Sequence, residues 1–283
     1  MKYLKIMMIL ATVTLAAVSC GSGNTQNKDQ KKAPKMLVVY YSQTSNTKAV
    51  ANEIATRVGA DMQEIVPVDP YENDFQATIE RGKRELDEGI LPEIQPLTVN
   101  VADYDVIFLG YPIWFGTYAP PVATFLDQVD LSGKTVVPFC TFGSGGLESS
   151  IRDLYQAEPN IRIVDGYGVR AARLEAMPKE VEAFLKATGF VEGEYVQPGE
   201  FTEQQPVGEA EAAIFDAAVG DYPMMHAKAE TVGSRSIPGG VEYLFVAVDL
   251  PREDRPDMPP AGMMKVYVVV MDGSAPEFTR VVR

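Results

Sequence analysis

The stretch MLVVYYSQTSNTKAVANEIATRV, residues 36–58, decides the fold of this chain. Its first six residues form an apolar run typical of a buried strand. After residue 47, apolar side chains recur three and four positions apart, as on one face of a helix. A strand that leads directly into a helix is the repeating unit of a parallel sheet covered by helices.

The junction between this strand and this helix is the run SQTSNT, residues 42–47. A helix N-terminus has free N–H groups and a partial positive charge, so hydroxyl and amide residues placed there suit a phosphate group. The run is not an ATP-type phosphate loop, because the order Gly-Lys-Ser/Thr is absent. A plain helix N-cap is the alternative, since Ser, Thr and Asn are common capping residues.

The alternation of short apolar runs with helical periodicity continues to about residue 190. It predicts an α/β domain over residues 35–190 with a doubly wound, five-stranded parallel sheet. The expected strands are residues 36–41, 61–67, 104–110, 135–141 and 161–165.

Two further loops follow expected strands of this sheet. The first of them is GYPIWFGTYAPP, residues 110–121, and the other is CTFGSGG, residues 140–146. In an open α/β sheet, ligands bind at the carboxyl ends of the strands, where all three loops would meet. The second loop offers a large aromatic side chain, Trp114, and the third offers glycines that allow a close approach of the backbone.

These three loops resemble those of the flavodoxin family, in particular its short-chain bacterial branch, over roughly half of the chain. The resemblance implies the strand order 2-1-3-4-5 and flavin mononucleotide (FMN) as the cofactor. It implies a phosphate site at the first loop and contacts to the isoalloxazine ring from the other two. The residues expected to bind FMN are Ser42, Gln43, Thr44, Ser45, Asn46, Thr47, Pro112, Ile113, Trp114, Phe115, Gly116, Thr141, Phe142, Gly143, Ser144 and Gly145.

The chain departs from the family pattern at two positions. Ser45 stands where the family prefers Gly, Ala or Cys, which is tolerable if the φ angle of this residue is not positive. Phe142 replaces the histidine of the short-chain motif CTHGGSG, so a proton donor near the flavin is missing.

The N-terminus reads as a secretory signal. Residues 1–20 have a basic start and an apolar run too short for a confident membrane span. The ending LAAVSC resembles a bacterial lipobox, which implies lipid attachment at Cys20; an ordinary cleaved signal is the alternative. Residues 21–34 are small and polar and are expected to form a flexible tether.

Composition and the remaining single residues exclude several classes of function. The net charge of −14 argues against a nucleic-acid partner, because phosphate contacts need clustered Lys and Arg. His226 is the only histidine, so neither a His-based metal cluster nor a Ser-His-Asp triad is expected. Cys140 is interpreted as a buried packing residue and the acidic run 251–260 as a solvated loop. No catalytic residue and no metal ligand is identified.

After a polar, proline-containing linker at residues 191–205, a second domain is expected over residues 206–283. A helix at 208–219 precedes strands at 224–237, 241–250, 263–271 and 277–282, with turn signals at PGG (238–240) and DG (272–273). This α+β order resembles the cystatin-like fold. The inhibitory Gln-x-Val-x-Gly tip is replaced by Arg235-Ser-Ile-Pro-Gly239, which favours a scaffold or docking domain.

The leading interpretation is an FMN-binding oxidoreductase or electron carrier, anchored outside the cytoplasm and served by a protein or membrane redox partner. One alternative is a surface binding or structural module that kept the fold and lost the flavin. Another is a cysteine-protease inhibitor that acts through the C-terminal domain.

Overall fold

The computed structural model describes residues 33–220, 222–223, 225–251 and 262–283. The chain divides into two compact units, Met1–Ala33 and Pro34–Arg283, and the following concerns the second. The expected signal and lipid-attachment site, and nearly all of the acidic run 251–260, lie outside the described residues. No helix in the described part of the chain is long and apolar enough to cross a membrane.

The first half of Pro34–Arg283 is built on a parallel sheet with the order β2-β1-β3-β5-β6, which confirms the predicted doubly wound arrangement. Central β1 pairs with β2 on one side and with β3 on the other, so Val39 lies beside both Gln63 and Leu109. A short strand, β4, pairs antiparallel with the end of β3. The strands are β1 (Met36–Tyr40), β2 (Asp61–Glu64), β3 (Val106–Trp114), β4 (Thr117–Tyr118), β5 (Thr135–Phe142), β6 (Arg162–Ile163) and β7 (Tyr167–Arg170).

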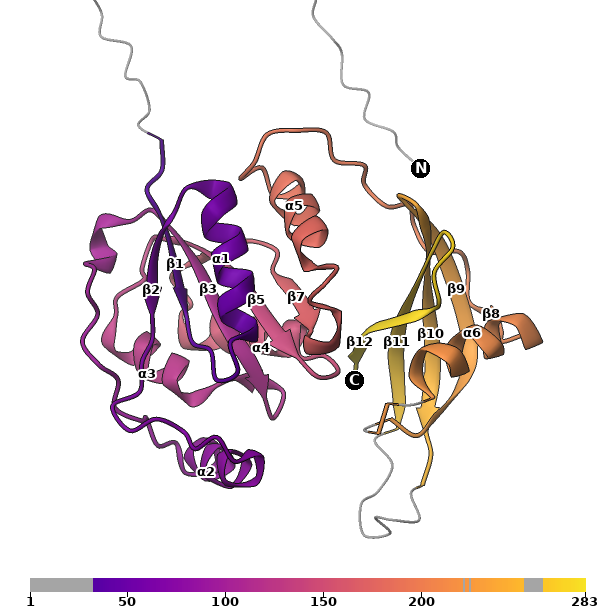
Figure 1. The fold of residues 1–283 in the computed structure, drawn as a ribbon, viewed down its shortest axis with the longest axis horizontal. Coiled ribbons are helices and arrows are strands. Elements are labelled where there is room, and N and C mark those ends of the chain that lie inside the picture. Colours follow the sequence, from indigo (N-terminus) through magenta and orange to yellow (C-terminus); the bar gives the residue numbers. More distant parts are fainter. Residues whose placement is uncertain (1–32, 221, 224, 252–261) are drawn as a thin grey trace, which may run out of the picture. The chain divides into compact units, whose positions relative to one another are not determined.

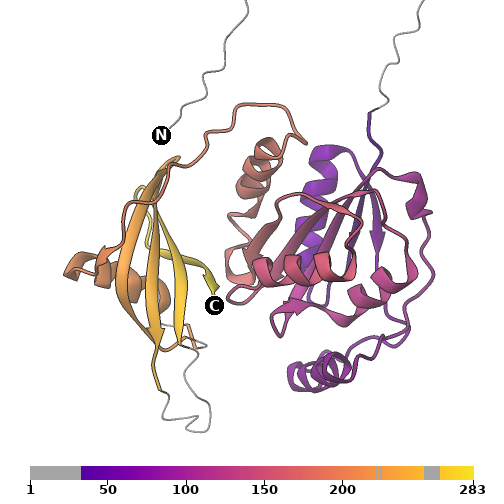
Figure 2. The ribbon, with the colours of Figure 1, turned by 180° about the vertical axis from the view of Figure 1, so that it is seen from behind.

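Helices cover both faces of this sheet (Figures 1 and 2). Successive side chains of a strand point to opposite faces, so Val38 packs with α1 and α5 while Leu37 packs with α3 and α4. Burial on both faces explains why the strands are apolar throughout instead of alternating. The helices are α1 (Asn46–Val58), α2 (Phe75–Glu88), α3 (Pro120–Gln128), α4 (Leu147–Ala157) and α5 (Met177–Ala187), with short 3-10 turns at Val101–Asp103 and Ala171–Arg173.

Three strand boundaries differ from those predicted. The strand expected at 61–67 ends at Glu64, and the range expected at 161–165 contains only the short strand β6, with β7 beginning beyond it at Tyr167. By contrast, β3 continues through the aromatic loop to Trp114, because its end pairs with β4 in a hairpin. Apolar runs indicate which segments are buried, whereas the length of a strand depends on how far its neighbour extends.

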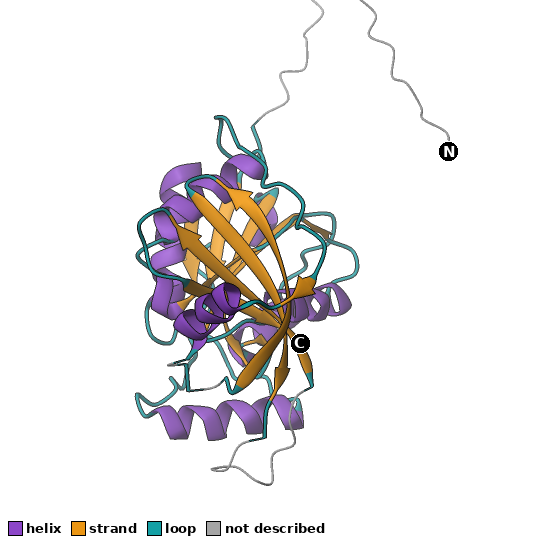
Figure 3. Cartoon of the chain, turned by 90° about the vertical axis from the view of Figure 1, so that its right-hand side faces the viewer, coloured by secondary structure: helices purple, strands orange, loops and turns teal. Residues whose placement is uncertain are grey.

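The second half of Pro34–Arg283 is an antiparallel sheet with the order β12-β11-β10-β9-β8 and one helix, α6 (Figure 3). Its core is formed where Phe215 of α6 meets Phe245 and Val266 of the sheet. Gly239 and Gly273 have φ angles of 77° and 76° in the two predicted turns, which only glycine adopts readily. The elements are β8 (Gln205–Pro206), α6 (Glu209–Val219), β9 (Ala227–Ile237), β10 (Gly240–Asp249), β11 (Met263–Met271) and β12 (Glu277–Val282).

Candidate functional site

The carboxyl ends of β1, β3 and β5 bring the three predicted loops together around a cavity of about 520 Å³. We call residues 42–47 the first loop, 110–121 the second and 140–146 the third. Of the residues expected to bind FMN, those that line this cavity are Gln43, Thr44, Pro112, Ile113, Trp114, Phe115 and Gly143. A volume of this size is typical of a small-molecule site.

The first loop turns into α1 through an unusual residue, Ser45. Its φ angle is 65°, so the condition under which Ser45 would be tolerable without strain, a φ that is not positive, is not met. A left-handed conformation costs an L-residue roughly 1–2 kcal/mol, a cost that glycine at this position would avoid. The side chain of Ser45 makes no capping hydrogen bond, and Ser42 Oγ instead accepts the backbone N–H of Lys48 at 3.2 Å. The N-cap residue of α1 therefore does not cap the helix through its side chain, and Ser42 makes a side-chain hydrogen bond to the first turn instead.

Gln43 ties the first loop to the segment that precedes α2. Its Oε1 accepts the hydroxyl of Tyr41 at 2.7 Å, and its Nε2 donates to the backbone carbonyl of Glu72 at 3.3 Å. With both ends of the amide engaged by the protein, Gln43 shapes the wall of the cavity.

Thr47 and Thr141 lie elsewhere than expected, because their side chains turn toward each other and not toward the cavity. Their hydroxyl oxygens are 2.8 Å apart, and the residues are 1% and 4% exposed. The pair joins the first turn of α1 to the end of β5. These two hydroxyl groups therefore hold the first and third loops together.

The aromatic residues of the second loop have different environments. Trp114 packs edge-on against Tyr71, with ring centroids 4.9 Å apart, and a Cβ added to Gly82 of α2 would lie 3.0 Å from its ring. Phe115 is 52% exposed and has a φ angle of 51°. Trp114 is thus held as part of the scaffold, whereas Phe115 leaves its ring available at the cavity.

A buried polar cluster holds Tyr71, the ring against which Trp114 packs. The Tyr71 hydroxyl donates to the Glu85 carboxylate, which also accepts Arg81 Nε at 2.8 Å. Burial, together with this hydrogen bond, raises the pKa of Tyr71 well above its usual value. The phenol is therefore the donor of this hydrogen bond and the carboxylate its acceptor.

The third loop borders a second cavity, of about 500 Å³, that shares Ile113, Phe115 and Gly143 with the first. Gly116, Ser144 and Gly145 also line it. Phe142 also borders it, but this residue is only 4% exposed and packs into the core. The prediction that Phe142 lies along a flavin ring is therefore unsupported by its burial.

Ser42 and Asn46 are half-buried and Ser45 is exposed at the start of α1, and none of the three lines either cavity. They surround the first helical turn, where Ser42 Oγ accepts the N–H of Lys48 and the N–H groups of Asn46 and Thr47 would hold an anion. This end of α1 is the place that the sequence predicted for a phosphate.

The sequence reasoning missed the segment before and at the start of α2, which forms another wall of the first cavity. Phe75 is 78% exposed there, although it is a large apolar side chain. The helix was overlooked because it is mostly polar, with only Gly82 and Glu85 buried. Asp74, whose side chain accepts the backbone N–H of Ala77, was a readable N-cap signal.

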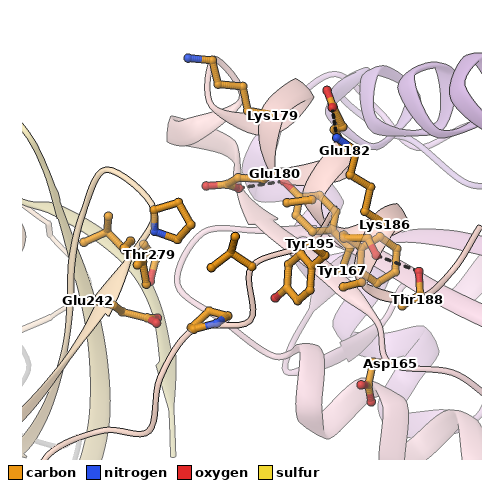
Figure 4. A pocket seen from close by; sticks show the side chains of 18 of the residues that line it. Asp165, Tyr167, Lys179, Glu180, Glu182, Lys186, Thr188, Tyr195, Glu242 and Thr279 are labelled. Atoms are coloured by element: carbon orange, nitrogen blue, oxygen red, sulfur yellow. Dashed lines mark hydrogen bonds and ion pairs between the residues drawn. The ribbon is translucent and has the colours of Figure 1, made fainter. Parts of the chain in front are cut away.

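A larger cavity, of about 830 Å³, lies away from the three loops, between α5, the 194–198 segment and the C-terminal sheet (Figure 4). Its charged groups are largely engaged with each other. Glu180 accepts the Tyr167 hydroxyl at 2.9 Å, and Glu182 pairs with Lys186 at 2.6 Å. Each of these two carboxylates therefore already has a partner within the protein.

The other residues singled out from the sequence, Cys140 and His226, have environments that indicate structural roles. Cys140 is completely buried, and burial raises the pKa of its thiol well above the usual value. His226 is exposed just before β9, with Nδ1 3.0 Å from the carbonyl oxygen of Pro251. Among the described residues, no group of His, Cys, Asp and Glu could hold a metal ion.

Comparison with known proteins finds similar chains among solved structures and curated proteins. A candidate flavoprotein from Bacteroides eggerthii has a solved structure that matches with 30% identity and a TM-score of 0.50, over 56% of this chain and 99% of its own. A Lactobacillus acidophilus flavoprotein solved in complex with FMN is 25% identical, with a TM-score of 0.44, over 48% of this chain and 93% of its own.

Among curated proteins, NAD(P)H dehydrogenase (quinone) 3 of Rhizobium meliloti is 33% identical over 41% of this chain. The match spans 58% of that relative's length. The family model for flavodoxin matches residues 35–183, which is more than half of the chain and contains all three loops. This protein therefore belongs to the flavodoxin family.

Proposed function

We propose that this protein binds FMN at the carboxyl edge of its parallel sheet and acts as a flavin-dependent oxidoreductase or electron carrier. The observation that carries the proposal is the cavity of about 520 Å³, which Thr44 of the first loop, the aromatic second loop and Gly143 of the third loop line together. Such convergence of three loops on one sheet edge is the usual form of a cofactor site in open α/β proteins.

The residues present fit the parts of FMN. The first turn of α1 offers backbone N–H groups next to Thr44 and Asn46, which suits the phosphate. Phe115 offers an exposed aromatic face for the ring system, and Gly143 lets the backbone approach it closely. The flavin would supply the transfer of one or two electrons, while the protein binds it, orients it and limits its contact with water.

Charge and proton supply bear on the chemistry at this site. The net charge of −14 disfavours an anionic reduced cofactor and so lowers its reduction potential. Phe142 cannot donate a proton, and it is buried. Both features favour a role in electron transfer over proton-coupled reduction of a bound substrate. The quinone dehydrogenase of Rhizobium meliloti supports oxidoreductase chemistry as the wider class.

We propose further that the N-terminal lipobox-like sequence anchors the protein outside the cytoplasm through Cys20. Soluble nicotinamide cofactors are expected to be scarce there, so a membrane-bound or protein electron donor is the matching partner. Incorporation of labelled palmitate into the wild-type chain, and its loss in Cys20→Ser, would test this anchor.

For the C-terminal part, we propose a cystatin-like arrangement that serves as a scaffold or docking domain. The order of α6 followed by four long antiparallel strands supports it. Inhibition of a papain-like protease by the purified protein, independent of flavin, would instead favour the inhibitor alternative.

The test of the main proposal is an absorption spectrum of residues 34–283 followed by FMN titration. Trp114 is the only tryptophan and lines the cavity, so its fluorescence reports on binding there. We expect flavin bands, or saturable quenching at or below micromolar FMN. The absence of both would contradict the proposal and favour a flavin-free binding module.

Riboflavin, which lacks the phosphate, is the matched control ligand. If the first loop holds the phosphate, FMN should bind at least about tenfold more tightly than riboflavin. Thr44→Ala should weaken FMN and leave riboflavin unchanged. Equal affinities for the two ligands would contradict the assignment of the phosphate site.

A further inference from the structure

The third loop of the flavin site is in direct contact with the C-terminal sheet through Arg170. This arginine ends β7, where it lies beside Phe142 in register. Its Nε donates to the backbone carbonyl of Gly143 at 2.8 Å, and its Nη1 donates to the backbone carbonyl of Phe278 in β12 at 2.9 Å. One guanidinium group therefore joins a loop of the cofactor site to a strand more than 100 residues away in the sequence.

Aromatic rings of the C-terminal region hold this guanidinium in place. It lies over the ring of Phe278 at 4.2 Å from the centroid and over the ring of Tyr222 at 4.9 Å. A planar guanidinium stacked on aromatic faces keeps its donors in fixed directions, which a lysine ammonium does not. Arg170 is thus oriented to hold Gly143 at one position.

A backbone contact fixes the next two residues of the same loop. The N–H of Val281 in β12 donates to the carbonyl of Ser144 at 2.7 Å, and Gly145 forms a parallel bridge with Val281. A Cβ added to Gly145 would lie 2.1 Å from the carbonyl oxygen of Val281. The loop therefore approaches β12 at a distance that only glycine allows.

These contacts matter because the third loop is rich in glycine, at Gly143, Gly145 and Gly146. Glycines have more backbone freedom than other residues and lose more entropy when they are ordered. A loop that must be ordered when the ligand arrives binds it less tightly than one that is already in place. Anchoring Gly143, Ser144 and Gly145 in advance removes part of that cost.

We propose that Arg170 is a positioning residue of the flavin site, and that with β12 it makes the C-terminal sheet a working part of that site. The inference rests on the proposed binding of FMN. It assigns to the C-terminal sheet a role in setting cofactor affinity and reduction potential, beyond that of a scaffold.

Ion pairs of Arg173 link the same parts of the chain but do not contact the third loop. Arg173 pairs with Glu277 of β12 at 2.8 Å and with Glu180 of α5 at 2.8 Å. It is therefore a matched control for Arg170, since it lies three residues away and contacts the same strand. Methionine keeps most of the length of either arginine and removes the charge and donors.

The test compares Arg170→Met and Arg173→Met in the full-length protein by FMN titration and by the midpoint potentials of the bound flavin. Arg170→Met is expected to weaken FMN binding about tenfold or more and to shift the potentials, because the third loop lies along the ring. Arg173→Met is expected to stay within about twofold of wild type in FMN affinity. A potential shift separates positioning at the flavin from a loss of stability alone.

Gly145→Ala is the second, independent variant, because its methyl group would push the third loop away from β12 while Arg170 remains. It should also weaken FMN and shift the potentials, with the far-UV circular dichroism of the wild type. If both variants bind FMN like the wild type, or if Arg173→Met weakens it as much as Arg170→Met, the proposal is overturned. Failure of the wild-type protein to bind FMN would instead overturn the proposed function, so the two failures are distinguishable.

Discussion

The hydroxyl pair formed by Thr47 and Thr141 provides a quantitative test of whether these residues serve the fold or the ligand. Both side chains are almost completely buried, and their oxygens are 2.8 Å apart. Thr47→Val preserves the shape of the side chain and leaves the Thr141 hydroxyl without its partner. A buried polar group that loses its only partner costs about 1–3 kcal/mol, so we expect a loss near 2 kcal/mol.

The double variant Thr47→Val, Thr141→Val should cost much less than the two single losses together. Replacing both partners by apolar groups of the same shape is nearly neutral, so we expect about 0–1 kcal/mol. The resulting coupling energy of roughly 3–4 kcal/mol is at the upper end of what two residues in contact show.

Urea unfolding of residues 34–283 without FMN, followed by the fluorescence of Trp114, measures these changes. With a slope of roughly 3 kcal/mol per molar urea, each single substitution should lower the midpoint by about 0.7 M. Additive losses would refute the reasoning, since they would show that the two hydroxyl groups act independently. A single substitution that spares stability but weakens FMN would also refute it, because that hydroxyl would then face the ligand.

Four further predictions follow from the same geometry. Gln43→Leu removes the hydrogen bond to the backbone of the segment before α2 and should lower the affinity for FMN, measured by titration, about tenfold. Gln76→Leu, on the exposed face of α2, is the control and should leave this affinity unchanged. Gly116→Ala, at a φ of 87° in the wall of the second cavity, should shift the midpoint potentials of FMN bound as proposed, whereas Gly133→Ala, at a φ of 76° in an equally open place outside both cavities, should not; equal shifts would contradict a specific role. Cys140 in residues 34–283 should react with a thiol reagent only after unfolding, because burial raises its pKa and blocks access. Burial raises the pKa of Tyr71 and Tyr167 above 10.0, so the folded state holds these protons more tightly than the unfolded chain does. Their contribution to the free energy of unfolding is therefore complete below about pH 10 and declines above it. Urea midpoints at about pH 9 and pH 11 would measure this decline.

Much of the parallel sheet was readable from the sequence because its strands are buried on both faces. Val38 packs against one layer of helices and Leu37 against the other, so the whole run is apolar. The three loops, with their hydroxyl, aromatic and glycine residues, follow these apolar runs. The parallel topology brings the loops to one edge of the sheet. That is why the first cavity contains Thr44, Trp114 and Gly143, which come from three different loops.

Local sequence also predicted the two turns of the C-terminal sheet. Gly239 and Gly273 are needed there because both have positive φ angles. The same kind of reasoning left the φ angle of Ser45 open, because its positive value depends on how the first loop must turn into α1. It also missed α2, because a helix with few buried residues has little apolar periodicity to detect.

What the sequence by itself determined is the parallel sheet, the three loops and the likeness to flavodoxins. Only the tertiary structure decided the partners of individual side chains, such as Thr47 with Thr141, 94 positions apart, and Arg170 with Phe278, 108 positions apart. The physical reason is that periodicity and turn chemistry depend on neighbouring residues, which the sequence displays directly. Contacts between distant residues depend on how every layer of the fold packs at once, and no local pattern records that.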